Sequence, residues 1–359
     1  MLYLFSAALF LPQAGIQACS GMGFIMNKNS SSKNTGEVLL QIRDLSIGIH
    51  EAGGVYTAVD SISYDVYAGE ILGVVGESGC GKTVTNLAIM GLLPDVLFVK
   101  GGSILYKNRD LNAIKPAERA QLNGDEMAMI YQEPLTSLNP LMKIGKQVGE
   151  PLRIHHKLPK EKIRERVIEV LGDVDLPDPE EIMERYPHQL SGGQRQRVMI
   201  AMAAITRPRL LIADEPTTAL DVTVQAQILQ LLKRLNRKYR TSIIFISHDL
   251  AVINQICDRV IVMYAGKIAE VGTTRMIMDS PAHEYTKGLI RSIPTMDQKG
   301  SDLHCIPGHV PSTTDDKLPC PFADRCTIGE AVCRKEAPPC LEIEPGHIVY
   351  CHCVSGQRQ

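Results

Sequence analysis

A glycine-rich stretch that ends in lysine and threonine is the first feature of this sequence with the residue types for phosphate chemistry. Glycines let a backbone loop wrap around phosphates so that successive N–H groups point inward. Lys82 would neutralise the β and γ phosphates, and the Thr83 hydroxyl would ligate Mg²⁺. A glycine-rich turn that merely precedes a helix is the alternative, and the Lys-Thr pair disfavours it. The loop reads Gly76-Glu77-Ser78-Gly79-Cys80-Gly81-Lys82-Thr83.

Two adjacent acids at the end of an apolar run supply a second part of the same chemistry. Residues 210–213 read as a buried strand, and Asp214 and Glu215 follow it directly. Ligands gather at the carboxyl edge of a parallel sheet. We therefore expect Asp214 to hold Mg²⁺ through water and Glu215 to polarise an attacking water. Two acids at a solvated strand end are the alternative, which a phosphate-binding loop in the same chain disfavours.

These residues need strands and helices to position them, and the apolar spacing predicts both. Continuous apolar runs predict buried strands, alternation predicts half-buried strands, and a period of 3.6 predicts helices. A strand, a glycine-rich loop and a helix, followed by strands separated by helices, are typical of a parallel α/β sheet. The predicted strands are 38–47, 61–66, 71–75, 209–213, 242–247 and 260–264, and the predicted helices are 83–93, 160–171, 194–205 and 222–239.

Composition divides the chain into three parts. Residues 1–37 form an extension whose apolar start resembles a secretion signal, but no Lys or Arg precedes Lys28. We interpret it as an over-extended reading frame with the working start at Met26 or Met22. The other parts are a main domain at 38–280, with a helical subdomain at about 134–206, and a small loop-rich region at 281–359 that is rich in Pro, Cys and Gly.

Charge and hydropathy exclude some classes of protein. Lys and Arg number 38 against 40 for Asp and Glu, so the chain lacks the cationic excess of proteins that bind nucleic acid. No uninterrupted apolar stretch reaches about 18 residues, so nothing in the chain is expected to cross a bilayer by itself. We expect any membrane association to go through a partner, and we expect no nucleic acid partner.

The pentapeptide Leu190-Ser191-Gly192-Gly193-Gln194 opens a predicted helix. A hydroxyl, two amides without side chains and a helix N-terminus together suit an anion, although the same residues would also make an ordinary helix cap. With this pentapeptide the sequence, from about Val38 to Ile290, resembles the ATP-binding cassette (ABC) family. The resemblance implies a P-loop α/β fold with an antiparallel β portion and a helical subdomain. It also implies two facing cassettes that bind ATP and Mg²⁺, with the pentapeptide of one closing on the γ-phosphate held by the other.

Three further positions match this family residue by residue. Gln132 fits the glutamine loop that touches Mg²⁺ or water and links to the membrane subunit. His248 fits the switch histidine that contacts the γ-phosphate and helps Glu215 orient water, and Asp221 fits the loop that crosses the dimer interface. The alternatives are a polar loop residue, a satisfied core histidine and a helix N-cap.

Segments 133–140, 280–289 and 320–326 are similar to the ATPases of oligopeptide and dipeptide permeases. That branch also includes nickel importers, so the cargo stays open between peptides, nickel and another small solute. The resemblance implies two transmembrane permease subunits, a homologous ATPase subunit and an extracytoplasmic solute-binding protein as partners. It implies a peripheral location on the cytoplasmic face of the cell membrane. The rival interpretation is a soluble ABC ATPase without a role in transport.

Six of the ten cysteines lie in the last forty or so residues, which indicates a local site. Their spacing lacks the close Cys pair of common zinc sites and does not name a metal. Some members of the branch carry a four-cysteine iron–sulfur cluster here, and an unmetallated structural tail is the alternative. The resemblance implies a 4Fe–4S cluster on Cys320, Cys326, Cys333 and Cys340, with Cys351 or Cys353 able to replace one ligand.

The family's adenine-stacking aromatic residue has no clear counterpart. Our alignment places Ile49 at that position, and His50 or Tyr56 would have to substitute for it. The sequence therefore predicts no adenine contact and leaves the preference for ATP over GTP open.

Overall fold

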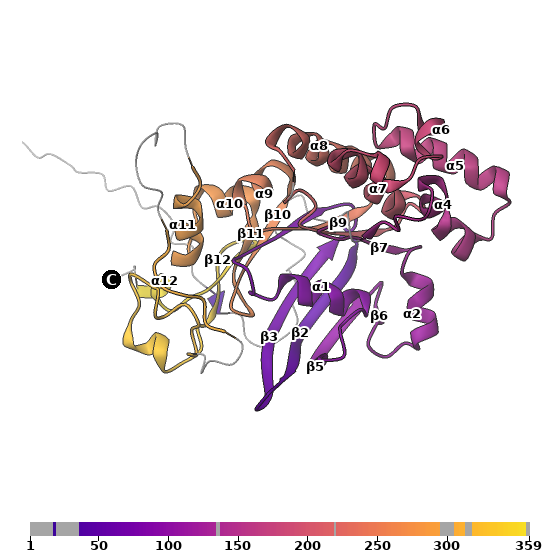
Figure 1. Ribbon diagram of the computed structural model, residues 1–359. Coiled ribbons are helices and arrows are strands. Elements are labelled where there is room, and N and C mark those ends of the chain that lie inside the picture. Colours follow the sequence, from indigo (N-terminus) through magenta and orange to yellow (C-terminus); the bar gives the residue numbers. More distant parts are fainter. Residues whose placement is uncertain are drawn as a thin grey trace, which may run out of the picture.

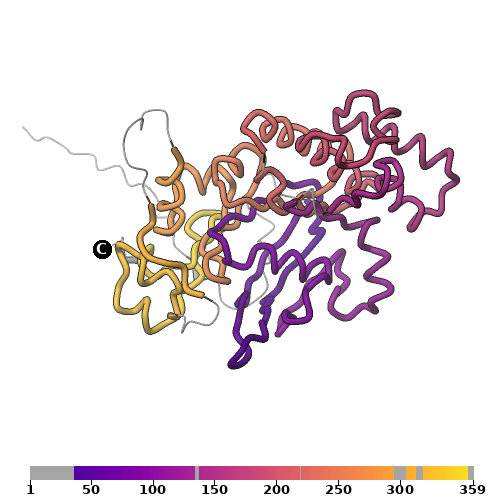
Figure 2. The backbone as a smooth tube through the Cα atoms, viewed as in Figure 1, coloured from indigo at the N-terminus to yellow at the C-terminus, as the bar shows by residue number. Residues whose placement is uncertain are grey.

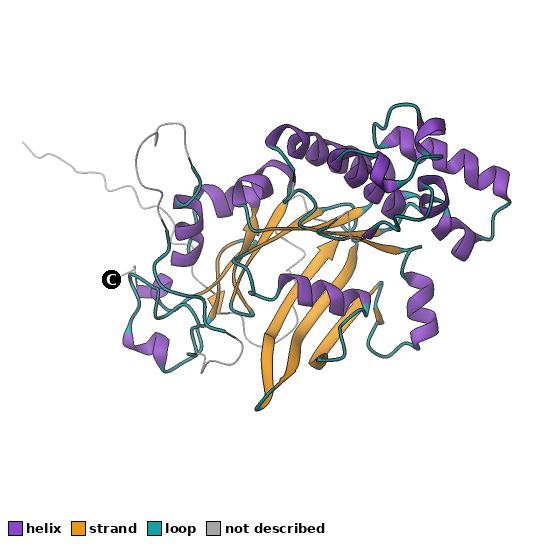
Figure 3. Cartoon of the chain, viewed as in Figure 1, coloured by secondary structure: helices purple, strands orange, loops and turns teal. Residues whose placement is uncertain are grey.

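The computed structural model describes residues 17–18, 36–133, 137–218, 220–294, 305–312 and 318–356. Within these ranges two β-sheets lie against each other and helices cover the larger one, as Figures 1 and 3 show. Most of the predicted extension at 1–37, including Met22 and Met26, lies outside the described residues. No helix in the described ranges is long and apolar enough to span a bilayer.

A five-stranded parallel sheet forms the centre of the fold. Its strands are the apolar runs expected for a sheet that is covered on both faces, and the predicted strands at 71–75 and 242–247 are confirmed at both ends. In spatial order the strands are β10 (Arg259–Tyr264), β4 (Ile71–Val75), β9 (Ser242–Ser247), β8 (Leu210–Asp214) and β7 (Met127–Ile130).

The predicted antiparallel portion is a second sheet of four strands. Alternation along its strands buries one face against the parallel sheet, where Leu40 and Ile42 share a core with Ile212 and Ile244. Helix α1 (Lys82–Met90) adds Ala88, Ile89 and Met90 to this core. In spatial order the strands are β3 (Gly54–Tyr67), β2 (Val38–Glu51), β5 (Leu97–Tyr106) and β6 (Arg109–Asp110).

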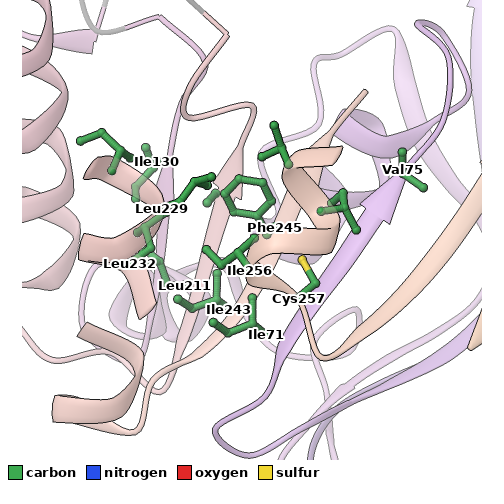
Figure 4. Packing of buried hydrophobic residues seen from close by; sticks show 14 of the residues in the cluster. Ile71, Val75, Ile130, Leu211, Leu229, Leu232, Ile243, Phe245, Ile256 and Cys257 are labelled. Carbon is green, nitrogen blue, oxygen red and sulfur yellow. The ribbon is translucent and has the colours of Figure 1, made fainter. Parts of the chain in front are cut away.

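Helices pack on the opposite face of the parallel sheet. Figure 4 shows Leu229 and Leu232 of α8 (Val222–Tyr239) packing toward Leu211, Ile243 and Phe245 of the sheet. The amphipathic spacing of α8 explains this burial. The helical subdomain is found beyond the edge of the sheet. Its helices are α4 (Ile144–Val148), η1 (Leu152–His156), α5 (Lys160–Asp173), α6 (Pro179–Ile182), η2 (Pro187–Gln189) and α7 (Gly192–Ala204). Outside the subdomain, α9 (Leu250–Ile256) packs beside α8, and α2 (Pro116–Leu122) follows β6.

The C-terminal region adds strands to the main sheet. Strand β13 (His347–Tyr350) pairs with β11 (Lys267–Thr273), and β12 (Cys340–Glu344) pairs with β13, all antiparallel. The sequence predicts a small loop-rich region from residue 281 onward, whereas this hairpin continues the sheet of the main domain. Figure 2 shows the yellow segment of residues 340–356 lying beside the orange segment around 260–290. Other elements here are β1 (Gln17–Ala18), paired with β12, and α10 (Thr274–Asp279), α11 (Glu284–Arg291), η4 (Ala331–Arg334) and α12 (Cys353–Gly356).

A buried ion pair joins this hairpin to the start of α11. The Glu270 carboxylate accepts hydrogen bonds from His347 Nε2 at 2.7 Å and from the N–H groups of Ala282 and His283 at 2.7 and 3.0 Å. Burial opposes ionisation of both partners. The hydrogen bond and the charge of Glu270 nevertheless raise the pKa of His347, and the contacts to His347 and the N–H groups lower the pKa of Glu270.

We predict that this pair makes stability fall as the pH rises. Because the pKa of His347 is higher in the folded than in the unfolded chain, the stabilisation is fully present below about pH 6.5, the ordinary pKa of histidine, and is lost as the pH rises through the folded pKa. Denaturant unfolding at about pH 6 and about pH 8.5 should show a fall in the free energy of unfolding that is smaller in His347→Gln. An equal fall in both proteins would contradict the prediction.

Candidate nucleotide site

The glycine-rich loop connects β4 to α1 and closes around the Lys82 side chain. Lys82 Nζ donates to the carbonyl oxygens of Gly76 at 2.6 Å and Glu77 at 3.1 Å, and the side chain is buried. Gly81 stands directly before α1 with φ 99°, in the left-handed region that favours glycine. The loop therefore presents an ammonium group and a helix N-terminus at one place, as a phosphate site requires.

The two residues predicted to hold Mg²⁺ lie side by side. Thr83 Oγ1 donates to Asp214 Oδ1 at 3.3 Å, which joins α1 to the end of β8. Burial raises the pKa of Asp214, and the hydrogen bond from Thr83 acts against this rise. A hydroxyl and a carboxylate are the hard oxygen ligands that Mg²⁺ prefers, so this pair fits the cation.

The carboxylate of Glu215 is the meeting point of three loops. Its Oε2 lies 2.8 Å from Thr218 Oγ1, 3.3 Å from Gln132 Nε2 and 3.3 Å from His248 Nδ1. The structure thus brings together the three residues that the sequence predicted to be catalytic. Glu215 itself has φ 45°, a left-handed conformation that costs a non-glycine residue about 1–2 kcal/mol. Thr218 was not predicted, and its place three residues after Glu215 is the only sequence signal for it.

The pentapeptide and Asp221 occupy helix starts. Ser191 Oγ accepts from Gln194 N–H at 3.3 Å and Ser191 N–H donates to Gln194 Oε1 at 3.0 Å, which caps α7. The Asp221 carboxylate likewise accepts from Val224 N–H at 2.9 Å at the start of α8. In Figure 1, α7 lies among the helices on one side of the main sheet and α1 lies on the other side. Within one chain these residues act as caps, and their predicted contact with nucleotide stays a prediction.

The three residues considered as adenine contacts, Ile49, His50 and Tyr56, lie at the β2–β3 hairpin. Ile49 and Tyr56 are cross-strand partners there, and the ring of His50 stacks on Phe98 with centroids 4.7 Å apart. The ring of His50 is therefore already stacked on another ring. The structure gives no reason to choose Ile49, His50 or Tyr56 as the adenine contact.

The C-terminal region also reaches the glycine-rich loop. The guanidinium of Arg325 forms an ion pair with the Glu77 carboxylate, with contacts of 2.7 and 3.1 Å, and Tyr285 Oη accepts from Glu77 N–H at 2.9 Å. Neither contact was predicted from the sequence. The only signal available was that each residue lies in a segment similar to the peptide permease ATPases.

Comparison with known proteins shows which family has these loops in this order. Residues 59–218 match the ABC transporter family, and residues 269–333 match the oligopeptide/dipeptide transporter C-terminal region. The dipeptide transport ATP-binding protein DppD of Bacillus subtilis (strain 168) is 47% identical over 316 residues, which are 88% of this chain and 94% of that protein. The chain belongs to the ATP-binding proteins of ABC transporters.

Two further relatives agree with this assignment. The oligopeptide transport ATP-binding protein OppD of Escherichia coli (strain K12) is 43% identical over 89% of this chain and 94% of its own length. A solved dimeric structure of an ATP-binding cassette in a post-hydrolysis state, bound to ADP and Pi, superposes with a TM-score of 0.60 at 26% identity. It covers 66% of this chain and 99% of that chain. As an ATP-binding protein of an ABC transporter, the chain is an ATPase coupled to transport.

The cysteines of the C-terminal region do not gather as the sequence predicted. Cys320, Cys326, Cys333 and Cys353 each lie near Cys351, and Cys333 Sγ lies 3.9 Å from Cys353 Sγ. Cys340 instead packs against the core on the other face of the sheet. Cys340 therefore lies apart from the other three residues of the predicted set, Cys320, Cys326 and Cys333.

Burial raises the pKa of four of the clustered thiols, those of Cys320, Cys326, Cys351 and Cys353, and so favours their neutral form. Burial raises the pKa of Cys320 to about 11 and that of Cys353 to about 12. Among the residues that the structure describes, no group of three or more His, Cys, Asp or Glu side chains is arranged to hold a metal ion. The observed geometry therefore does not support the predicted iron–sulfur cluster.

We predict that Gly81→Ala weakens nucleotide binding about tenfold or more. An added Cβ would lie 2.8 Å from Val59 Cγ2, and the left-handed φ costs alanine about 1–2 kcal/mol, so the loop must change shape. Calorimetric titration of ATP into the full chain measures the effect. Gly172→Ala is the matched control, since a Cβ at this exposed position near the end of α5 meets open space. Unchanged affinity in Gly81→Ala would contradict the prediction.

Proposed function

We propose that this chain hydrolyses ATP to power the import of dipeptides or oligopeptides, with the nucleotide held by residues 76–83. The observation that carries the proposal is the Glu215 carboxylate, which Gln132, Thr218 and His248 approach at the edge where Lys82 and Asp214 also lie. The relatives named for dipeptide and oligopeptide transport, and the match to their C-terminal region, support the choice of cargo.

In the proposed reaction each residue has one role. Lys82 and the N–H groups of the loop bind the β and γ phosphates, and Thr83 and Asp214 would hold Mg²⁺, which would neutralise phosphate charge. Glu215 positions the water that attacks the γ-phosphorus in line with the leaving ADP oxygen. His248 contacts the γ-phosphate and orients Glu215, and their 3.3 Å separation supports this role. Catalysis is then mainly positioning and charge stabilisation.

The complete site requires a second cassette. We propose that the segment from Ser191 to Gln194 of each cassette closes on the γ-phosphate bound by the other, with Asp221 at the interface. Both segments are capped helix starts before any partner arrives, so their N–H groups need little reordering on closure. The partner is either a second copy or a homologous ATPase subunit.

Closure of the two cassettes would move the permease. Gln132 lies at the junction of the sheet with the helical subdomain and contacts Glu215, so it is suited to link hydrolysis to the membrane subunits. We propose two transmembrane permease subunits and an extracytoplasmic solute-binding protein as the remaining partners. The cassette itself would lie on the cytoplasmic face of the cell membrane.

Nickel or another small solute as cargo is the alternative within the same mechanism. The cassette does not contact cargo in this scheme, so its residues act in the same way for each solute. A soluble ABC ATPase without a role in transport is disfavoured, because residues 269–333 match a region described for oligopeptide and dipeptide transporters.

An iron–sulfur cluster has no part in this mechanism. The thiols of Cys320, Cys326, Cys333, Cys351 and Cys353 are near one another, but their arrangement does not fit a metal. The proposed hydrolysis therefore uses no group from these cysteines.

Uptake of labelled dipeptides, oligopeptides and Ni²⁺, in cells that carry the wild type or Glu215→Gln, tests the proposal. We expect peptide uptake and ATP hydrolysis to fall about 100-fold or more, because the amide cannot act as a base, while ATP binding is kept. Glu118→Gln is the matched control, since Glu118 makes only an exposed ion pair with Arg109.

The outcomes of this experiment separate the alternatives. Loss of Ni²⁺ uptake alone would overturn the peptide cargo and leave the mechanism intact. Loss of hydrolysis with no change in any uptake would overturn the transport function. Full hydrolysis in Glu215→Gln would overturn the catalytic assignment.

A further inference from the structure

One residue of the phosphate-binding loop, Glu77, is held by two side chains from the C-terminal region. Arg325 Nη1 and Nη2 donate to the two oxygens of the Glu77 carboxylate at 2.7 and 3.1 Å, and Tyr285 Oη accepts from Glu77 N–H at 2.9 Å. The Arg325 side chain is 5% exposed and that of Glu77 is 30% exposed. This pair is bidentate and its guanidinium is buried, so it differs from the surface ion pairs elsewhere in the described residues.

The guanidinium of Arg325 uses every nitrogen it has. Besides Glu77, it donates from Nε to Pro307 O at 2.9 Å, from Nη2 to Ile306 O at 3.1 Å and from Nη1 to Tyr264 Oη at 3.2 Å. These five hydrogen bonds match the five N–H groups of arginine. A lysine in the same place has three donors and no planar fork, so it could not make the same set.

Aromatic packing places Tyr285 and Arg325 together. The ring of Phe322, three residues before Arg325, lies 5.4 Å from that of Tyr285 and 5.2 Å from that of Tyr264. Tyr285 and Tyr264 are 4.7 Å apart and both fully buried. The segment around Phe322 and Arg325 therefore docks as one unit onto α11, the end of β10 and the phosphate-binding loop.

The backbone of Glu77 contacts the ammonium group of Lys82 directly. Lys82 Nζ donates to the carbonyl oxygens of Gly76 and Glu77, so the position of the Glu77 backbone affects where the ammonium group lies. Gly76 on the other side is packed so closely that an added Cβ would lie 2.2 Å from Met263 O. The first turn of the loop is thus fixed by β10 on one side and by the C-terminal region on the other.

We propose that Arg325 and Tyr285 are positioning residues for the ATPase reaction, which act through Glu77 on the shape of the phosphate-binding loop. ATP binding then depends on docking of the C-terminal region, not on the cassette core alone. The inference rests on the proposed role of residues 76–83 in binding phosphate.

Steady-state ATP hydrolysis by the full chain, and by the transporter complex that contains it, tests the proposal. We expect Arg325→Gln and Arg325→Lys to raise the KM for ATP about tenfold with less than about a twofold change in kcat, because the loss is in binding. Tyr285→Phe should raise the KM by a smaller factor. Arg334→Gln, in the same region, removes an exposed ion pair with Asp324 and should leave the KM unchanged.

A double-mutant cycle separates positioning from simple stabilisation. If Arg325 acts through Glu77, the KM of Arg325→Gln combined with Glu77→Gln should be no higher than that of Arg325→Gln alone. A purely structural role would lower the thermal stability of the Arg325 variants and leave the KM of the folded protein unchanged, and that result would overturn the proposal.

The Lys82→Ala variant distinguishes a failure of the positioning role of Arg325 from a failure of the proposed phosphate-binding role of residues 76–83. Undiminished ATP binding by Lys82→Ala would overturn the assignment of the loop, and the inference with it. Lost binding in Lys82→Ala with an unchanged KM in Arg325→Gln would overturn only the role of the C-terminal region.

Discussion

The register of three parallel strands is the constraint on which the nucleotide site depends. Val75 at the end of β4 is paired with Ser247 at the end of β9, and Asp214 at the end of β8 is paired with Ile246. The residues that follow these strands are the start of the phosphate-binding loop, His248 and Glu215. Because side chains alternate between faces, a slip of one residue in either pairing would turn these groups away from one another. Burial of these strands on both faces makes such a slip costly.

The central chemistry could be predicted from the sequence because it is local. The loop at 76–83, the acids Asp214 and Glu215, and the buried strands beside them each occupy a few consecutive residues, and each carries its own apolar or glycine pattern. Gln132 and His248 came from resemblance alone, and the structure brings both to Glu215. Thr218 escaped notice because a threonine three residues after an acid has no distinctive pattern.

The C-terminal region was harder to predict because its contacts are long-range. Cys340 shows the reason. It is the cross-strand partner of Tyr350, and successive residues on a strand face opposite sides. Cys351, one residue after Tyr350, is therefore on the opposite side from Cys340, in the group with Cys333 and Cys353. Spacing in the sequence counts residues between thiols but does not show which face of a strand each will take. The same holds for Arg325, whose partner Glu77 lies far away in sequence.

The hairpin of β12 and β13 has a consequence for synthesis of the protein. Strand β11 receives its outer neighbour only when β13 pairs with it, and β13 leaves the ribosome long after β11. Until then β11 presents an open, apolar edge, and such edges invite pairing with other chains. The buried carboxylate of Glu270 on β11 also waits for His347 on β13. During translation this edge therefore stays uncovered until β13 has been made, and the ion pair between Glu270 and His347 can form only then.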